Sequence, residues 1–397
     1  MLTTDVLIVG AGPAGATTSL FLASKGIAHT IVDRAVFPRD KVDGNAFSYK
    51  VLNVLEALGG SLKQQFLASP HLLQCSGEAQ IFAPNLMKHR FSLPCDKQVA
   101  PILTMSRVHF DNFLVKNLDS NYANVQLGTE IEDIVRVNNE LEVTITQNGL
   151  TSKLRTKLIV GADGERSIVL RKLAHKQKAP QKSAQTIHAY FQGLKGFEKN
   201  QNIEAHFIKP LLPNFLYITP LADGTYKVGL GMRSDILDRS NLDLEQVLFD
   251  TISNNYNSNL ASCFEGATLT GKIEHWPMSF GEPRKQVLSG HNYLLVGDAA
   301  SLCNPLTGFG TGNAMISGKI AAEFLQKALL CGQFDRSVLA GYDQEIFKTF
   351  QREFKFGYWM KRLASYPWFI NYLTTNIQIR KFIKNLFPSH LSQIKQV

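Results

Sequence analysis

The hydrophobic pattern of the first sixty residues predicts alternating strands and helices. Val6 to Val9 is a continuous apolar run, typical of a strand buried on both faces, and a helical stretch follows over residues 14–25. A second apolar run, Thr30 to Val32, precedes a second helix near Tyr49 to Leu58. Strands that alternate with helices are the units of a parallel α/β sheet, so we expect such a domain at the start of the chain.

Two later regions have the shorter runs and alternation of antiparallel strands. Residues 71–105 contain runs such as Gln80-Ile81-Phe82, and residues 176–280 are β-rich apart from one helix expected around Leu242 to Asn254. The runs that predict this second sheet are Thr186 to Phe191, Ile203 to Ile208, Phe215 to Thr219 and Tyr226 to Met232. The runs that predict a meander added to the first domain are Val125 to Val137, Glu140 to Thr146 and Leu154 to Val160. Without repeats or low-complexity linkers, these segments are expected to form one body.

Three glycine-rich motifs follow predicted strands in a fixed order. Gly10-Ala11-Gly12-Pro13-Ala14-Gly15 comes between the first strand and its helix, where helix N–H groups can bind a diphosphate. Asp33 ends the second strand, at the distance expected for a carboxylate that binds the ribose of an adenine nucleotide. Glycine turns also arise for structural reasons, and this motif alone does not distinguish FAD from NAD.

The other two motifs favour FAD. Gly161-Ala162-Asp163-Gly164 follows the run Leu158 to Val160, and Gly297-Asp298-Ala299-Ala300 follows Tyr293 to Val296. After Asn304-Pro305-Leu306-Thr307-Gly308-Phe309-Gly310-Thr311-Gly312 a long helix is expected over Asn313 to Leu330, and its N-terminus can stabilise the negative charge of a reduced flavin. The alternative is that both aspartates only cap strand-end turns.

The chain resembles the geranylgeranyl reductase family of FAD-dependent oxidoreductases, within the aromatic-hydroxylase-like flavoproteins. Three segments carry the resemblance: Phe37-Pro38-Arg39-Asp40-Lys41, the helix-like stretch Arg107 to Leu114, and Asn304-Pro305-Leu306-Thr307-Gly308. It covers most of the chain. It implies an α/β fold, α+β overall, with a Rossmann-like FAD-binding domain built as a three-layer ββα sandwich, an antiparallel substrate sheet and C-terminal helices.

The resemblance also implies which residues contact FAD. Gly10, Gly12, Ala14 and Gly15 would hold the diphosphate and Asp33 the ribose. Arg107 would approach the ribityl-diphosphate region, Asp298 the ribityl chain, and Gly310 and Thr311 the isoalloxazine. The remaining candidate cofactor-binding residues are Arg34, Gly44, Ile131, Asp163 and Gly308.

Two departures from the family pattern concern the substrate. Val42-Asp43-Gly44-Asn45 replaces the Pro-Cys-Gly-Gly of many members, and Phe215-Leu216-Tyr217-Ile218-Thr219-Pro220 replaces a tryptophan-bearing motif. The resemblance places Asp43 and Tyr217 near the flavin, which makes them candidate catalytic acids; the alternatives are a capping acid and a packed aromatic ring. His188, His206 and His275 are interpreted as ordinary surface or core residues.

The predicted domain boundaries follow from this order of motifs. Residues 1–70, 106–175 and 281–335 are assigned to a discontinuous FAD-binding domain, and 71–105 with 176–280 to a substrate-binding β-rich domain. Residues 336–397 are assigned to basic amphipathic helices, because from Phe354 onward Lys and Arg interleave with aromatic residues and no acid occurs. Such helices either lie on an anionic membrane surface or cap the substrate domain.

Composition limits the remaining possibilities. The chain has 397 residues, a formal net charge of +9 and five cysteines without a CxxC pair, which argues against a disulfide framework or a metal site. No signal peptide or long apolar span is recognised, so we expect a cytoplasmic protein, possibly peripheral at the inner face of the membrane. The basic charge accompanies apolar side chains, which makes nucleic acid an unlikely partner. The oligomeric state is left open.

Two enzyme hypotheses and one other remain. The first is reduction of a carbon–carbon double bond in an isoprenoid or other lipid-like substrate, with NAD(P)H or a ferredoxin-like protein as electron donor. The second is a monooxygenase or dehydrogenase that acts on an aromatic or polyketide-like compound. The third is a non-enzymatic, lipid-binding or scaffold flavoprotein.

Overall fold

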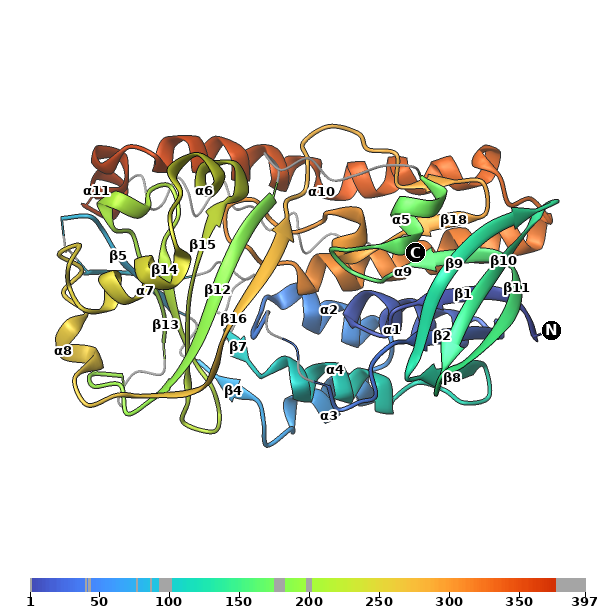
Figure 1. The fold of residues 1–397 in the computed structure, drawn as a ribbon, viewed down its shortest axis with the longest axis horizontal. Coiled ribbons are helices and arrows are strands. Elements are labelled where there is room, and N and C mark those ends of the chain that lie inside the picture. The colour runs from blue at the N-terminus through green and yellow to red at the C-terminus, as the bar shows by residue number, and fades with distance from the viewer. Residues whose placement is uncertain are drawn as a thin grey trace.

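A parallel sheet carries the first half of the fold. The computed structural model describes residues 2–39, 41, 44–75, 78–85, 88–92, 102–174, 183–197 and 202–375. The sheet has the strand order β17-β18-β11-β1-β2-β8, and every pair along it is parallel except β17–β18. Its strands are β1 (Leu2–Val9), β2 (His29–Asp33), β8 (Ala123–Leu127), β11 (Leu150–Gly161), β17 (Ser289–Gly290) and β18 (Tyr293–Leu295). In Figure 1 this sheet lies on the right, at the end that holds the N-terminus.

Helices and a β-meander cover the two faces of this sheet and give the three layers expected from the resemblance. The meander pairs β9 (Thr129–Val137) with β10 (Glu140–Gln147), and β10 with the first part of β11. On the other face α1 packs against α9, and Gly318 of α9 is needed because a Cβ there would lie 2.5 Å from the Ala14 carbonyl oxygen. The helices of this domain are α1 (Pro13–Ser24), α4 (Arg107–Lys116), α5 (Ile168–Leu173) and α9 (Thr311–Cys331), together with the 3-10 turn η3 (Gly297–Ala300).

The second sheet is built from two separate stretches of sequence. Its order is β16-β12-β15-β14-β13-β5-β6, and only the β13–β5 pair is parallel. The strands are β5 (Glu78–Phe82), β6 (Lys88–Ser92), β12 (Ser183–Gln192), β13 (Ile203–His206), β14 (Leu216–Pro220), β15 (Tyr226–Arg233) and β16 (Thr268–Ser279). They fall within 71–105 and 176–280, the predicted substrate-binding segments.

Side chains alternate between the two faces of this second sheet. On one face Ile187, Leu216 and Leu230 are buried in a core with α7, which excludes water from that side. The opposite face, with Thr186, Tyr217 and Gly231, borders a cavity. One helix was expected in this region, and its described residues form three α-helices: α6 (Ser234–Ser240), α7 (Leu244–Ile252) and α8 (Ala261–Phe264). Asn241, in the left-handed conformation, ends α6, and Asp243 caps α7 through Glu245 N, so the chain restarts the helix.

Three phenylalanine rings extend the core of the first domain toward a third, small sheet. Phe47, Phe66 and Phe110 are buried, and their ring centroids lie 4.4 to 6.0 Å apart. These rings anchor a three-stranded sheet and two helices beneath the cavity. The elements are β3 (Ala46–Phe47), β4 (Leu73–Gln74), β7 (Leu103–Thr104), α2 (Tyr49–Ala57) and α3 (Gly60–Leu67), and the 3-10 turn η2 (Lys209–Leu211) lies in the second sheet region.

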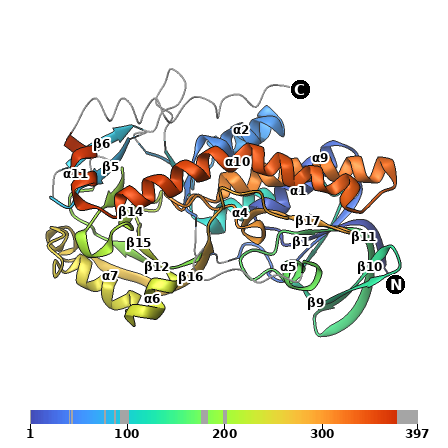
Figure 2. The same cartoon turned by 90° about the horizontal axis from the view of Figure 1, so that it is seen from above.

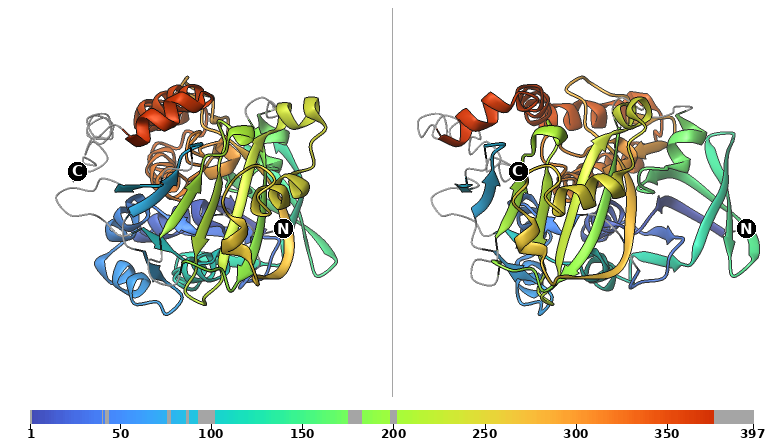
Figure 3. Two further views of the ribbon diagram at one scale, coloured as in Figure 1. Left: turned by 90° about the vertical axis from the view of Figure 1, so that its left-hand side faces the viewer. Right: turned by 60° about the vertical axis from the view of Figure 1, so that its left-hand side comes forward.

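One long helix connects the two halves. The helix α10 (Arg336–Ala364) runs along the top of the molecule from the parallel sheet to the second sheet, and α11 (Pro367–Thr375) turns back at its far end (Figures 1 and 2). The end views in Figure 3 show α10 and α11 above the strands of the second sheet. At Gly357 the helix α10 comes close to the loop after η3, because a Cβ there would lie only 2.8 Å from the Pro305 ring. The predicted C-terminal helices beyond residue 375 lie outside the described residues.

Candidate active site

The first glycine turn forms one end of the cavity. Gly10 has φ +103°, a conformation that favours glycine, and Gly12 caps α1 without any side-chain hydrogen bond, which leaves the first amides of the helix open. Gly12 and Ala14 line the cavity. Gly15, by contrast, lies behind the turn, where a Cβ would be 1.8 Å from the Gly10 carbonyl oxygen. In this position Gly15 allows close packing of helix on strand, and its contact with a diphosphate stays a prediction.

The three predicted motifs meet at this turn. A Cβ at Gly10 would lie 2.4 Å from the Ala162 carbonyl oxygen of the second motif, and one at Gly297 would lie 2.9 Å from Cβ of Ala14. A Cβ at Gly310 would lie 3.7 Å from Oδ1 of Asp298. The glycines therefore allow three distant stretches of backbone to approach one another around one space.

Asp33 and Asp163 are both engaged with backbone amides. The Asp33 carboxylate accepts from Ala11 N at 2.8 Å and Ala35 N at 2.9 Å, so it ties the end of β2 to the glycine turn. Oδ2 of Asp163 accepts from Ile168 N at 2.6 Å and caps α5, while its Oδ1 is buried without a hydrogen-bond partner among the described residues. Burial raises the pKa of Asp163 above its ordinary value. Both residues border the cavity.

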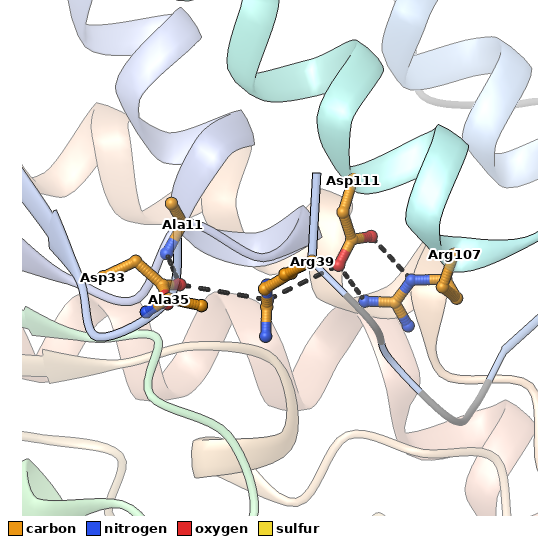
Figure 4. Close-up of polar contacts among 6 residues, drawn as sticks. All are labelled: Ala11, Asp33, Ala35, Arg39, Arg107 and Asp111. Carbon is orange, nitrogen blue, oxygen red and sulfur yellow. Dashed lines mark hydrogen bonds and ion pairs between the residues drawn. The ribbon is translucent and has the colours of Figure 1, made fainter. Parts of the chain in front are cut away.

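A chain of ion pairs runs along the cavity beside the turn (Figure 4). Asp111 binds Arg107 at two positions, 2.6 Å to Nε and 2.8 Å to Nη2, and Nη2 of Arg39 lies 3.4 Å from Asp111 and 3.8 Å from Asp33. Nε of Arg39 is buried without a partner in the described part of the chain. A half-buried guanidinium with an unused donor suits an anionic ligand such as a diphosphate. Arg39 and Asp111 were not among the predicted site residues, although the i,i+4 spacing of Arg107 and Asp111 is a detectable signal.

Predicted flavin-contacting residues from separate motifs lie side by side. At Gly44, where φ is +85°, a Cβ would lie 3.0 Å from Nη1 of Arg107 and 3.1 Å from Oγ1 of Thr311. Thr311 begins α9, and the cap residue Gly310 makes no side-chain hydrogen bond to the helix. The N-termini of α1 and α9 thus both open toward the same space, with the polarity that stabilises an anion.

The cavity has a volume of about 820 Å³ and extends from these motifs to the second sheet. The predicted site residues that line it are Gly10, Gly12, Ala14, Asp33, Arg34, Gly44, Arg107, Ile131, Asp163, Tyr217, Asp298, Gly308, Gly310 and Thr311. Asp43 lies outside the described residues. Two uncapped helix N-termini, an arginine with a free donor and a cradle of glycines fit the diphosphate and flavin ring of FAD, so these residues suit the cofactor.

A hydrogen-bonded relay leads away from the cavity at Tyr217. Thr186 donates to the Trp276 carbonyl at 2.8 Å, so its hydroxyl oxygen is available to accept from Nε2 of His188 at 3.0 Å. Nδ1 of His188 then accepts from the Tyr217 hydroxyl at 2.7 Å; these directions are assigned from the network. His188 is fully buried, and Gly229 leaves the space, since a Cβ there would lie 2.5 Å from the Tyr217 oxygen. Sequence reasoning took His188 for an ordinary residue.

Two lysines on the cavity wall lie over aromatic rings. Nζ of Lys41 is 3.7 Å from the centre of the Trp276 ring, and Nζ of Lys361 is 4.3 Å from that of Phe280. Burial, followed by the charge of Arg107, lowers the pKa of Lys41 to about 8. Burial likewise lowers the pKa of Lys361 to about 8. Neither lysine was predicted as a site residue, because only the fold brings them to these rings.

The far part of the cavity is apolar. Strands, the loop after η3, and the helices α10 and α11 all contribute to it. Its apolar side chains are Ile81, Ile203, Phe207, Phe215, Met278, Phe280, Pro305, Leu306, Phe309, Met360, Ile370 and Leu373. Such a wall binds hydrocarbon by excluding water. Within the described ranges, neither a cluster of metal-ligating side chains nor a helix long and apolar enough to cross a membrane is found.

Fold and site together define a flavoprotein of the FAD-dependent oxidoreductase class. The chain belongs to the FAD binding domain family, whose pattern matches residues 3–353. A menaquinone reductase of Mycolicibacterium smegmatis is 26% identical over 340 residues, 81% of this chain and 76% of its own length. A digeranylgeranylglycerophospholipid reductase of Methanocella arvoryzae is 24% identical over 91% of this chain and 87% of its own.

One further relative is named for a different reaction, and a solved structure shares the fold. A 1H-pyrrole-2-carbonyl-[peptidyl-carrier protein] chlorinase of Pseudomonas fluorescens is 24% identical over 89% of this chain and 82% of its own length. Among solved structures, a geranylgeranyl bacteriochlorophyll reductase-like protein of Thermoplasma acidophilum superposes with a TM-score of 0.81 at 18% identity, and covers 96% of both chains. This likeness confirms the predicted fold class, and the family confirms FAD as the cofactor that its members bind.

Proposed function

We propose that this oxidoreductase reduces carbon–carbon double bonds of an isoprenoid or other lipid-like substrate. The observation that carries the proposal is the cavity itself, which joins the FAD motifs at one end to an apolar wall at the other. A hydrocarbon chain would be stabilised there by about 25 cal/mol per Å² of apolar surface removed from water. The names of the reductase relatives agree with this substrate class.

When bound and reduced, FAD supplies a hydride to a carbon atom of the substrate. The chain's own residues supply the rest. Arg39 and the amides of α1 would hold the diphosphate, and the start of α9 would stabilise negative charge at the flavin ring. The apolar wall would hold the double bond in place and exclude water from the reacting carbon. NAD(P)H or a ferredoxin-like protein would supply the electrons.

The second hydrogen arrives as a proton, and two side chains on the cavity wall can carry one. Tyr217 remains a predicted donor, and its hydroxyl is hydrogen-bonded to Nδ1 of the buried His188 at 2.7 Å. Lys41 carries an ammonium group with a pKa of about 8, close to the value that suits a general acid at neutral pH. We therefore propose Lys41 as the donor, beside the earlier candidates Tyr217 and Asp43.

The alternative is a monooxygenase or dehydrogenase that acts on an aromatic or polyketide-like compound. The chlorinase relative shows that a related chain supports other reactions, and a tyrosine hydroxyl hydrogen-bonded to a buried histidine suits removal of a proton from a substrate hydroxyl. The monooxygenase alternative requires oxygen, whereas double-bond reduction does not.

The decisive experiment is anaerobic turnover. Holoenzyme reduced with dithionite is mixed with an unsaturated polyprenyl acceptor, and flavin absorbance and product mass are measured. We expect flavin reoxidation and a product two hydrogens heavier for each reduced bond. Lys41→Met should slow reoxidation by roughly 10²-fold or more while flavin reduction is unchanged. Oxygen incorporated from labelled O₂, with no anaerobic turnover of any unsaturated lipid, would contradict the proposal.

A further inference from the structure

The lysine over the Phe280 ring stands apart from the cofactor motifs. Lys361 lies in the last turn of α10, and its side chain borders the cavity next to Phe280 and Cys303. The Cys303 thiol donates to the Gly308 carbonyl at 2.9 Å. Lys361 is therefore a cation in the part of the cavity wall where aromatic, methionine and aliphatic side chains predominate.

The charges around Lys361 leave it without a counterion. Among the described residues none forms a hydrogen bond or ion pair with its ammonium group. The charge of Arg233 lowers the pKa of Lys361 further, after burial. Asp235 is shared between Arg233 at 2.7 Å and Arg239 at 2.7 Å, so this carboxylate is engaged with the two arginines.

Structural reasons do not account for such a residue. A cation in the last turn of a helix interacts favourably with the helix dipole, but the adjacent Arg362 provides that charge from an exposed position. A ring face offsets only part of the cost of removing an ammonium group from water. A methionine or leucine would pack against Phe280 without that cost. Buried cations that persist in apolar cavities are typical of ligand-binding sites.

We infer that Lys361 binds an acidic group, a carboxylate or a phosphate, carried by the apolar substrate of this cavity. The inference rests on the proposed function and narrows its substrate to an amphipathic acid rather than a neutral hydrocarbon or alcohol. The apolar part would lie along Met278, Met360, Ile370 and Leu373, and the acid would form a charge-assisted hydrogen bond with Nζ. One cation provides the charge, and the apolar wall excludes water from the pair.

Binding to the oxidised holoenzyme tests this without turnover. Three probes share the same isoprenoid hydrocarbon chain and differ in their end group: farnesyl phosphate, farnesoic acid and farnesol. Each is titrated calorimetrically. We expect one or both acids to bind at least about tenfold more tightly than the alcohol. The tighter acid identifies the kind of group. Lys361→Met should remove this preference and leave farnesol affinity within about twofold, whereas Lys361→Arg should retain most of it.

The control is Lys355→Met, which removes the same charge from an exposed position on the same helix and should change no affinity. FAD content and the unfolding midpoint verify that each variant is folded. Equal binding of acids and alcohol by the unmodified protein, absence of binding by all three probes, or an equal loss for all probes in Lys361→Met would overturn the inference. Double-bond reduction without acid preference would contradict only this inference, and acid binding without reduction only the proposed reaction.

Discussion

At the scale of single residues, two glycines of one motif have separable roles. A Cβ at Gly12 would meet only the flexible end of Arg39, at 3.3 Å, whereas one at Gly15 would overlap the Gly10 carbonyl oxygen. Gly12→Val should therefore leave the apoprotein folded and abolish FAD binding, because its side chain occupies the approach of the diphosphate. Gly15→Ala should lower the unfolding midpoint even without FAD.

Flavin absorbance per protein and calorimetry of the apoproteins separate these two effects. Gly60→Ala is a matched control, since a Cβ there would lie 3.9 Å from its nearest atom, Oε1 of Glu56. It should change neither flavin content nor the unfolding midpoint appreciably. A Gly12→Val protein that retains FAD at the level of the control would show that the turn does not hold the diphosphate.

Lys361 gives a second prediction at this scale, on pH. The pKa of its ammonium falls from the ordinary 10.5 to about 8 in the folded protein, with burial as the largest cause. Between these values the unfolded chain binds more protons, so the free energy of unfolding rises with pH as the cost of the buried charge disappears. Below pH 8 the cost is fully present. Lys361→Met should thus be more stable than the unmodified protein at pH 7, by roughly 1–3 kcal/mol.

This difference in stability should shrink as the pH approaches 10.5. Unfolding midpoints of the two holoproteins at pH 7 and pH 10 measure it, with Lys355→Met expected to lie close to the unmodified protein at both. A Lys361→Met variant that is less stable at pH 7 would show instead that the ammonium group stabilises the fold.

At the scale of elements, the strands and turns that depend on local backbone geometry could be predicted from the sequence. The strands that precede Gly10, Gly161 and Gly297 form as expected, because apolar runs and glycine turns act over a few residues. The ion pairs of Asp111 with Arg39 and of Lys50 with Glu353 were not predicted, since they join elements far apart in the chain. Lys50 also donates to Asn313 at 2.6 Å, and Glu353 accepts from Asn304 at 2.7 Å.

This last network explains why α10 belongs to the site. It ties α2, α9 and α10 to the loop that begins at Asn304, next to the predicted flavin contacts. Burial alone would raise the pKa of Glu353, but Lys50 and the amide hydrogen bonds hold it below its ordinary value. The sequence shows the loop motif and the helix separately. Their connection depends on which face of α10 turns inward. The sequence pattern did not decide this, because it fitted both a helix on a membrane surface and a helix packed on the protein core.

At the scale of the whole molecule, α10 and α11 line the cavity with some side chains and expose aromatic rings with others. Met360, Ile370 and Leu373 line the cavity, while Trp359 and Trp368 are 51% and 62% exposed. Tryptophan is favoured at the boundary between water and lipid, and exposed Lys355 and Arg362 on α10 suit anionic headgroups. Figure 1 places α11 at the end of the molecule opposite the β10–β11 hairpin. We therefore expect this end to contact anionic membranes, beside the wall that would receive a lipid-like chain.

Co-sedimentation with lipid vesicles tests this orientation. Anionic vesicles should bind the protein more strongly than neutral ones, and high salt should release much of it because the charges are screened. Replacing Trp359 and Trp368 together by alanine should weaken binding roughly tenfold or more, because apolar burial of both rings is lost. The control replaces Leu150 and Leu330, which are 77% and 81% exposed on β11 and α9, and should have little effect. If both pairs of substitutions weaken binding equally, or neither does, α10 and α11 are not the membrane-facing surface, and their aromatic residues only cover the substrate domain.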